Sequence, residues 1–448
     1  MLLLTPWNVR MVEFGNRLVG ASPLGCPIPS ACESRLLFGQ AREPAPTRAQ
    51  ATAGESAEAA GLYVHVPLCR SKCRYCGFYS VPVAGQDTGR LVAAVLRELD
   101  HYDGIEFCTA YVGGGSPTAL PAEQLIGLVR RIAECFSQVG EFTVECNPGQ
   151  VDAELLARLR QAGVNRLSFG AQSFRAAELE LLGRAHSVEE IGRAVDLARR
   201  AGFHNVGLDL IFAIPGSTLG DWQYSVEAAI ELGVQHVSAY SLSFEAGTLF
   251  DAWRRAGRLS PVDEELDRAM YEWAIERLGQ AGLGQYEISN FARPGFQCRH
   301  NLGYWANRPY VGIGPGAASS STGILPVVLN SWAGRPCYGP GVRVTHDPNI
   351  ERYVAAVESG GEVPGEVQPV SCDDAVCETA VLNLRTRTGI NLAAFRRRTG
   401  HDATHTFAGP IRRYRDLGLI EVTDRSVRLT EQALPIADSI LCDFAALE

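Results

Sequence analysis

The stretch Gly61–Ser80 reads GLYVHVPLCRSKCRYCGFYS. Its first part, Leu62–Val66, is an apolar run that predicts a buried strand, and Pro67 ends that strand because proline lacks a backbone N–H. Three cysteines follow at once in C-x₃-C-x₂-C spacing, and they are Cys69, Cys73 and Cys76. We expect the rest of the chain to be organised around this strand and this cysteine loop.

Three thiolates on one loop can hold three irons of a [4Fe-4S] cluster, which normally takes four cysteines. The fourth iron is then open to an amino and a carboxylate group, and S-adenosylmethionine is the cofactor that turns such an iron to radical chemistry. A zinc loop is the alternative, because C-x₂₋₄-C pairs commonly bind zinc. Zinc would require a second cysteine pair nearby, which the sequence lacks. The spacing therefore favours the cluster, and the sequence here resembles the radical S-adenosylmethionine superfamily.

The length, net charge and cysteine content of the chain limit the class of protein. The chain has 448 residues, enough for two or three domains, because single cores stop growing at about 250–300 residues. Its net charge of −9 argues against a nucleic-acid partner. The 13 cysteines are an odd number without the pattern of a disulfide-rich secreted domain, so we expect a reducing, cytoplasmic compartment. No apolar run approaches the roughly 20 residues that a transmembrane helix needs.

Strand-like and helix-like runs alternate after the cysteine loop. Strands are expected at Thr109–Gly113, Glu141–Cys146, Arg166–Gly170, Val206–Phe212, His236–Leu242 and Gly284–Ser289. Helices are expected between them at Pro121–Phe136, Asp152–Gln161, Ala176–Leu182, Val188–Ala201, Leu219–Leu232 and Asp263–Ala281. This alternation predicts an α/β fold with about six parallel repeats, a partial (β/α)₆ barrel of the TIM type. Chemistry in such barrels lies at the C-terminal ends of the strands, and we expect every motif below at or near such an end.

The chain divides into four predicted segments. Residues 1–60 are expected to be a disordered extension with little to bury, which a translation start assigned too far upstream would explain. Residues 61–318 form the barrel. Residues 319–370 are expected to be an irregular insertion and linker, because 319–348 is rich in Gly, Pro and Ser. Residues 371–448 combine helices with a possible hairpin at 419–430 and predict a small winged-helix-like domain.

The run Gly113–Pro117, GGGSP, follows the second strand. Glycines let backbone approach a ligand closely and donate N–H groups to it, although a glycine run alone indicates only a tight turn. At this distance after the cysteines, the run is similar to the GGG-T-P turn that holds the methionine end of the cofactor in the superfamily. The resemblance assigns this role to Gly114, Gly115 and Ser116, with serine in place of the more usual threonine.

Four polar side chains stand at strand ends or in nearby loops: Glu145, Gln172, Arg184 and Asp209. A buried carboxylate is costly unless it is hydrogen-bonded, and ribose hydroxyls would supply such bonds. The amide and the guanidinium can add further polar contacts. Any one of the four is as readily a satisfied polar group of the barrel. Together they match cofactor positions of oxygen-independent coproporphyrinogen III oxidase and its relatives. That resemblance covers about residues 61–446 and adds Tyr63, Phe78, Ser243 and Ala318.

Two features distinguish among these relatives. The oxidases carry a further cysteine two places after the third cluster cysteine, and this chain has Phe78 there. The stretch Arg299–Trp305, RHNLGYW, contains the H-N-x-x-Y-W signature of the HemW-type haem chaperones, with GIGPGA at 312–317 behind it. His300 can ligate haem iron, whereas a histidine beside aromatics is otherwise a packed core residue. Tyr304 and Trp305 offer aromatic faces to the macrocycle. The family often has histidine where this chain has Ala318.

The resemblance implies a haem-binding protein that carries a [4Fe-4S] cluster and S-adenosylmethionine and delivers haem to an apo-haemoprotein such as a respiratory enzyme. The first alternative is an oxygen-independent coproporphyrinogen III dehydrogenase, whose radical abstracts hydrogen from two propionate side chains before decarboxylation. Another radical enzyme with an unknown substrate is the second alternative. Phe78 and the HNLGYW stretch speak against the dehydrogenase. A homodimer is compatible with the sequence.

Overall fold

The computed structural model describes residues 60–135, 140–321 and 341–447. The predicted N-terminal extension lies outside these residues up to position 59, and so does the part of the predicted insertion at 322–340. Across the described ranges, no helix combines the length and the apolarity that crossing a bilayer requires.

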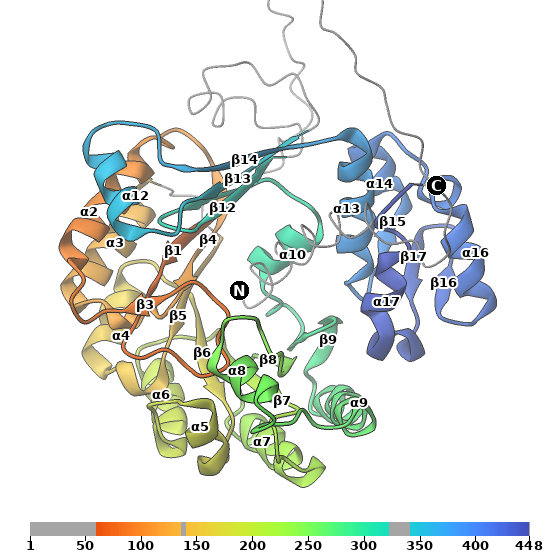
Figure 1. The fold of residues 1–448 in the computed structure, drawn as a ribbon, viewed down its shortest axis with the longest axis horizontal. Helices are drawn as coiled ribbons and strands as arrows, with labels where there is room; N and C mark the ends of the chain where they lie inside the picture. The colour runs from red at the N-terminus through yellow and green to blue at the C-terminus, as the bar shows by residue number, and fades with distance from the viewer. Residues whose placement is uncertain (1–59, 136–139, 322–340, 448) are drawn as a thin grey trace, which may run out of the picture. The chain divides into compact units, whose positions relative to one another are not determined.

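Six parallel strands form the centre of a 12-stranded sheet (Figure 1). In sheet order they are β1 (Ala60–Val66), β4 (Phe107–Gly114), β5 (Glu141–Cys146), β6 (Arg166–Gln172), β7 (Val206–Phe212) and β8 (His236–Ser241). They are largely buried, because helices cover one face and side chains pack against the other. The sheet has two free ends instead of closing on itself. The predicted partial (β/α)₆ barrel is therefore confirmed.

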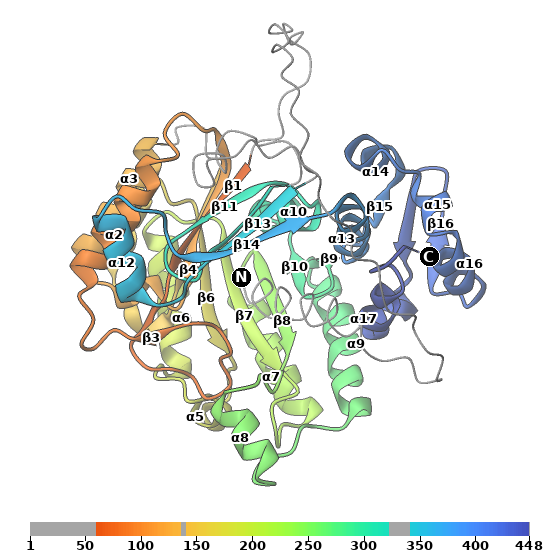
Figure 2. The same cartoon turned by 45° about the horizontal axis from the view of Figure 1, so that its top comes forward.

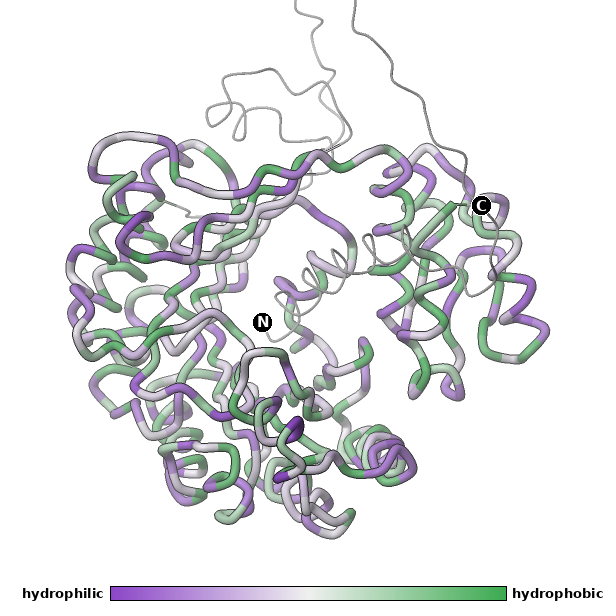
Figure 3. The backbone as a smooth tube through the Cα atoms, viewed as in Figure 1, coloured by the Kyte–Doolittle hydropathy of each residue, from purple (hydrophilic) through white to green (hydrophobic). Residues whose placement is uncertain are grey.

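Helices cover the outer face of this sheet (Figure 2). They are α2 (Thr88–Asp100), α3 (Ala122–Cys135), α4 (Ala153–Gln161), α6 (Val188–Arg200), α7 (Leu219–Glu231) and α9 (Glu264–Gln280). The tube in Figure 3 alternates between hydrophobic and hydrophilic colours along them, as expected of helices with one face on a sheet. In α3 the buried residues are Leu125, Ile126, Leu128, Val129 and Ile132. Two short helices, α5 (Ala176–Leu182) and α8 (Leu249–Arg255), follow the C-terminal ends of β6 and β8.

Further strands extend both edges of the sheet. Beyond β8 lie β10 (Asn290–Ala292) and β9 (Gly284–Glu287). Beside β1 lies the parallel strand β11 (Tyr310–Ile313), followed outward by the antiparallel strands β12 (Ala318–Ser321), β13 (Gly341–His346) and β14 (Gly365–Val370). With α12 (Ile350–Glu358), these strands correct the expectation of an irregular segment at 319–370. The strands are short, and Pro369 is tolerated because β14 is an edge strand.

The C-terminal region forms a small helical domain with a three-stranded antiparallel sheet, as the winged-helix-like prediction requires. Its helices are α13 (Cys372–Leu384), α14 (Leu392–Thr399), α15 (Ala403–Thr406), α16 (Ala408–Asp416) and α17 (Ala437–Cys442). Its strands are β15 (Ile390–Asn391), β17 (Ser426–Leu429) and β16 (Ile420–Val422), in sheet order. Helix α17 is preceded by the 3₁₀ segment η3 (Glu431–Ile436), in which Pro435 has no N–H to donate to an α-helical hydrogen bond.

Candidate functional site

The three-cysteine loop follows the C-terminal end of β1. A pair of two-residue parallel strands, β2 (Leu68–Cys69) and β3 (Val81–Pro82), braces its two ends. Inside the loop, the Cys76 amide donates to the Cys73 carbonyl oxygen at 3.3 Å. All three cysteines are free and half-buried. The loop therefore presents three thiols at the end of the barrel where the sequence analysis expected them.

The donor chemistry of this loop fits a [4Fe-4S] cluster. Burial raises the pKa of Cys69, and it raises that of Cys76 to about 12, so a metal must displace these protons when it binds. Arg184 donates from Nη1 to Cys73 Sγ at 3.3 Å. Among the described residues, no three His, Cys, Asp or Glu side chains converge as around a single ion. A four-iron cluster does not require such convergence, because each thiolate binds a different iron.

The glycine turn lies directly against the cysteine loop. The Gly115 amide donates to Val66 O at 2.9 Å, and the Ser116 amide donates to Leu68 O at 2.7 Å. A Cβ at Gly115 would overlap the Leu68 backbone oxygen, and one at Gly114 would lie 2.7 Å from the His65 ring. The Gly114 amide donates to Glu145 Oε2 at 3.2 Å. We expected these N–H groups to face a ligand, but here they serve to hold the turn close to the loop.

Polar side chains from β4 to β7 gather behind the turn. Glu145 accepts from the Tyr111 hydroxyl at 2.8 Å, and Asp209 accepts from the Ser168 hydroxyl at 3.2 Å. Burial raises the pKa of Glu145. Gln172 is 5% exposed and has a φ of 69°, and its Oε1 has no hydrogen-bond partner among the described residues. A strained residue with an orphaned acceptor is typical of a ligand site, so this group of residues fits a polar cofactor such as S-adenosylmethionine.

The remaining predicted cofactor residues are spread around this end of the barrel. Tyr63 is buried on β1, with its hydroxyl 3.3 Å from His65 Nδ1. Phe78 is half-buried in the cysteine loop, and its carbonyl accepts from Lys72. Ser243 is exposed after β8, and Ala318 begins β12. Sequence reasoning missed Tyr111 and Ser168. Their strands, β4 and β6, carry polar residues at alternate positions, and this pattern could have identified them.

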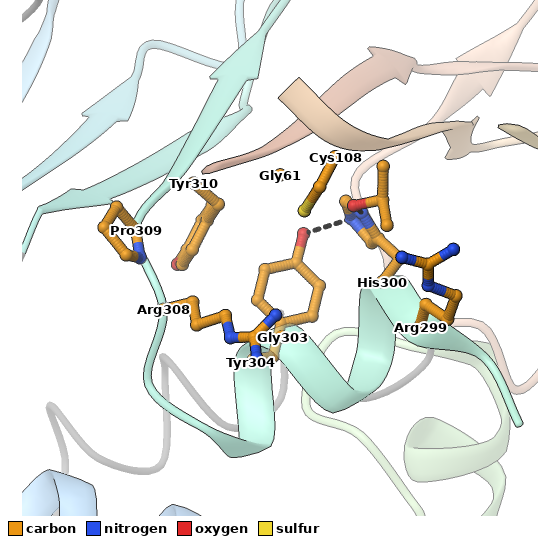
Figure 4. Close-up of a pocket in the computed structure, with 10 residues that line it drawn as sticks. Gly61, Cys108, Arg299, His300, Gly303, Tyr304, Arg308, Pro309 and Tyr310 are labelled. Atoms are coloured by element: carbon orange, nitrogen blue, oxygen red, sulfur yellow. Dashed lines mark hydrogen bonds between the residues drawn. The ribbon is translucent and has the colours of Figure 1, made fainter. Parts of the chain in front are cut away.

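The RHNLGYW stretch forms a short helix, α10 (Arg299–Trp305), at the opposite end of the strands (Figure 4). Glu141, the first residue of β5, accepts from the amides of Arg299 and His300 at 3.0 Å each. His300 Nδ1 lies 2.8 Å from Thr109 Oγ1, near the start of β4. This placement corrects the expectation that every motif lies at a C-terminal strand end. The order of elements along the chain does not show that α10 packs at the N-terminal ends of the barrel strands.

Both imidazole nitrogens of His300 are occupied. Besides the Nδ1 bond, Nε2 lies 2.8 Å from the Tyr304 hydroxyl. His300 is 3% exposed, and burial lowers its pKa to about 3. The pocket beside it is also lined by Cys108 and Tyr310 (Figure 4), and its volume is about 10 Å³. A cavity of this size holds about one water molecule, so a porphyrin would require this pocket to open.

The C-terminal domain holds the other end of α10. Asn383 on α13 donates to the Trp305 carbonyl oxygen at 2.8 Å, and Arg398 on α14 donates to Ala306 O at 3.0 Å. The Arg385 guanidinium lies 4.9 Å from the centre of the buried Trp305 ring. Trp305 is thus a contact between the barrel and this domain, whereas His300 and Tyr304 line the pocket.

Comparisons with known proteins agree with this architecture. Residues 63–229 match the family profile "Radical SAM superfamily", and residues 370–436 match "HemN C-terminal domain". Together with the partial barrel and the three-cysteine loop, the matches define a radical SAM protein.

The chain belongs to the family of the heme chaperone HemW. It is 32% identical over 389 residues to "Heme chaperone HemW" of Bacillus subtilis (strain 168), covering 85% of this chain and 98% of that relative. It is 38% identical over 272 residues to the protein of the same name from Escherichia coli (strain K12), covering 58% and 70%. The solved structure of Escherichia coli coproporphyrinogen III oxidase (HemN), called a radical SAM enzyme, shares the fold at a TM-score of 0.72 and 21% identity, covering 87% of this chain and 91% of that one.

Proposed function

We propose that this protein is a haem-binding chaperone of the radical SAM type, which carries a [4Fe-4S] cluster and S-adenosylmethionine and passes haem to an apo-haemoprotein in the cytoplasm. The observation that carries the proposal is the likeness to "Heme chaperone HemW" over 98% of that relative's length. This likeness includes the cysteine loop and the HNLGYW helix within one continuous chain.

Cys69, Cys73 and Cys76 would hold the cluster, and S-adenosylmethionine would bind the open iron. When bound, this pair supplies a reductively generated 5′-deoxyadenosyl radical. Around it, Glu145 and Asp209 are acceptors for ribose hydroxyls, and the unpartnered Oε1 of Gln172 is an acceptor for a donor on the nucleotide. The turn Gly114–Ser116 and the Tyr63 ring shape the space beside the cluster. Arg184 places a positive charge at Cys73.

Haem would use the other end of the barrel, with His300 Nε2 as the iron ligand. The Tyr304 hydroxyl now occupies that nitrogen, so binding requires this bond to break and the pocket to widen. The Thr109 bond to Nδ1 can remain and would orient the ring, as a hydrogen bond to the second nitrogen usually does for a ligating histidine.

Two observations favour a chaperone over a coproporphyrinogen III dehydrogenase. Phe78 stands where the oxidases have a further cysteine. His300 and the glycine turn contact opposite ends of β4: from Thr109 to Gly114 the strand spans about 16 Å at about 3.3 Å per residue. Hydrogen abstraction needs reacting atoms about 3–3.5 Å apart, so a macrocycle held at His300 lies beyond the reach of a radical formed at the cluster.

Two assays test the proposal. Anaerobically purified protein should contain about four irons and four sulfides per chain, and the triple variant Cys69→Ala, Cys73→Ala, Cys76→Ala should contain neither. Haem titration should show binding by the wild type that His300→Ala abolishes. Equal haem binding by both proteins would contradict the assignment of His300. Conversion of coproporphyrinogen III to protoporphyrinogen IX by the wild type would favour the dehydrogenase.

A further inference from the structure

Arg74 stands between the second and third cysteines of the loop and makes contacts in two directions. Its backbone N–H donates to Leu182 O at 3.0 Å, and its backbone oxygen accepts from the Phe250 amide at 3.0 Å. The first contact joins the loop to the C-terminal end of α5, and the second joins it to the start of α8. The loop is therefore fixed to two other βα connections at one of the two residues that separate Cys73 from Cys76.

The side chain of Arg74 strengthens both attachments. Its Nη1 donates to the carbonyl oxygens of Glu180 and Leu181 at 2.9 and 3.1 Å, which are among the carbonyls that a helix leaves without intrahelical partners. The guanidinium also lies 5.5 Å from the centre of the Trp253 ring on α8, within cation–π range. The aliphatic stem packs over Gly183, where an added Cβ would lie 3.1 Å from Arg74 Cγ.

The other basic residues of the loop make no such attachment to any part of the chain that the structure describes. Lys72 is exposed and donates within the loop, to the Phe78 oxygen at 3.2 Å. Arg70 is exposed, and among the described residues no hydrogen bond or ion pair joins it to another side chain or carbonyl. Charge alone therefore does not explain the placement of Arg74.

We propose that Arg74 is a positioning residue that holds Cys73 and Cys76 in place for the cluster, so that cluster retention depends on its guanidinium. This inference rests on the proposed cluster at these cysteines. Without the side chain, the middle of the loop keeps the two backbone bonds of Arg74 and the Arg184 bond to Cys73. It loses the guanidinium contacts to α5 and α8, and the spacing of the thiolates becomes less fixed. A site held by ordered neighbours keeps its metal better than one whose loop must be ordered by the metal itself.

The test compares anaerobically reconstituted wild type with Arg74→Met, which keeps the stem and removes the donors. We expect the variant to lose iron to a chelator about tenfold faster, since hydrogen bonds from a charged group are strong enough for such a factor, and to show shifted g-values in the electron paramagnetic resonance spectrum of the reduced cluster. Arg70→Met is the matched control and should behave like the wild type. Leu156→Ala, in the buried face of α4, should lower the melting temperature and leave iron loss unchanged.

Equal iron loss and identical spectra for Arg74→Met and Arg70→Met would overturn the inference, and so would equally fast loss from Leu156→Ala. If Arg74→Met does not fold, Arg74→Gln gives the same comparison with the same criteria. A wild type that takes up no iron and sulfide would instead refute the proposed function itself.

Discussion

Tyr304→Phe should strengthen haem binding. In the free protein, the Tyr304 hydroxyl lies 2.8 Å from His300 Nε2, so this bond competes directly with iron. The phenylalanine ring can keep the edge contact with Tyr310, whose ring centre lies 4.6 Å away. The variant therefore removes the competing group and little else.

The size of the effect follows from the burial of His300. Because this side chain is 3% exposed, a ring nitrogen that loses its partner cannot bond to water and costs about 1–3 kcal/mol. The haem-free Tyr304→Phe variant bears this cost, because His300 Nε2 has lost its partner. Iron bound to Nε2 removes the cost. Haem affinity should thus rise by about 5- to 150-fold.

Titration of haem into the anaerobic protein, followed by Soret absorbance, measures this change. Tyr353→Phe is the matched control, because it removes a buried hydroxyl that bonds to Glu98, away from α10, and it should leave the dissociation constant unchanged. If Tyr304→Phe binds haem no more tightly than the wild type, then Nε2 is not the iron ligand.

Three further predictions concern stability, measured by urea unfolding of the cluster-free protein. Glu98→Ala should lose about 3–5 kcal/mol, because the buried carboxylate accepts two hydrogen bonds, from a backbone amide and a tyrosine hydroxyl; a loss below about 1 kcal/mol would contradict this account. Burial lowers the pKa of His186 to about 4, so below about pH 6.5 the unfolded chain binds a proton at this residue that the folded protein does not. The contribution of His186 to stability should therefore fall by about 2 kcal/mol from pH 7.5 to 5. His186→Gln should remove this part of the pH dependence, and an unchanged slope would show that another group causes it. Gly115→Ala should destabilise the protein by at least about 2 kcal/mol through backbone overlap, whereas Gly127→Ala, which meets nothing within 4 Å on α3, should be neutral or stabilising; equal effects would refute the overlap.

The repeating part of the fold was predictable from sequence, because its strands and helices have clear hydrophobic periods. The expected strand Val206–Phe212 is β7 with the same bounds, and the expected helix Pro121–Phe136 contains α3. At one edge of the sheet, the expected strand Gly284–Ser289 contains β9. The strands at the other edge, β12, β13 and β14, were not predicted. β13 and β14 are six residues long each and follow a segment rich in Gly, Pro and Ser, so composition concealed them.

The candidate site was predicted in its residue types but only partly in its geometry. The neighbourhood of Glu145 and Gln172 follows from their positions at the ends of the adjacent parallel strands β5 and β6, whereas Arg184 lies in the loop after α5. The location of His300 does not, because a helix that follows the barrel can pack at either end of it. The amides of the glycine turn were expected to donate to a ligand. In the structure they donate to other parts of the protein, which the sequence does not show.

The hydrogen bonds between the C-terminal domain and α10 bear on the proposed transfer of haem. The carbonyl groups bound by Asn383 and Arg398 belong to the last residue of the helix that carries His300 and to the residue after it. A displacement of that helix large enough to admit a macrocycle must stretch these bonds. Under the proposed function, loading of haem at His300 would therefore be mechanically linked to the C-terminal domain. A receiving protein that contacts this domain would then meet a different surface on the haem-loaded protein than on the haem-free one.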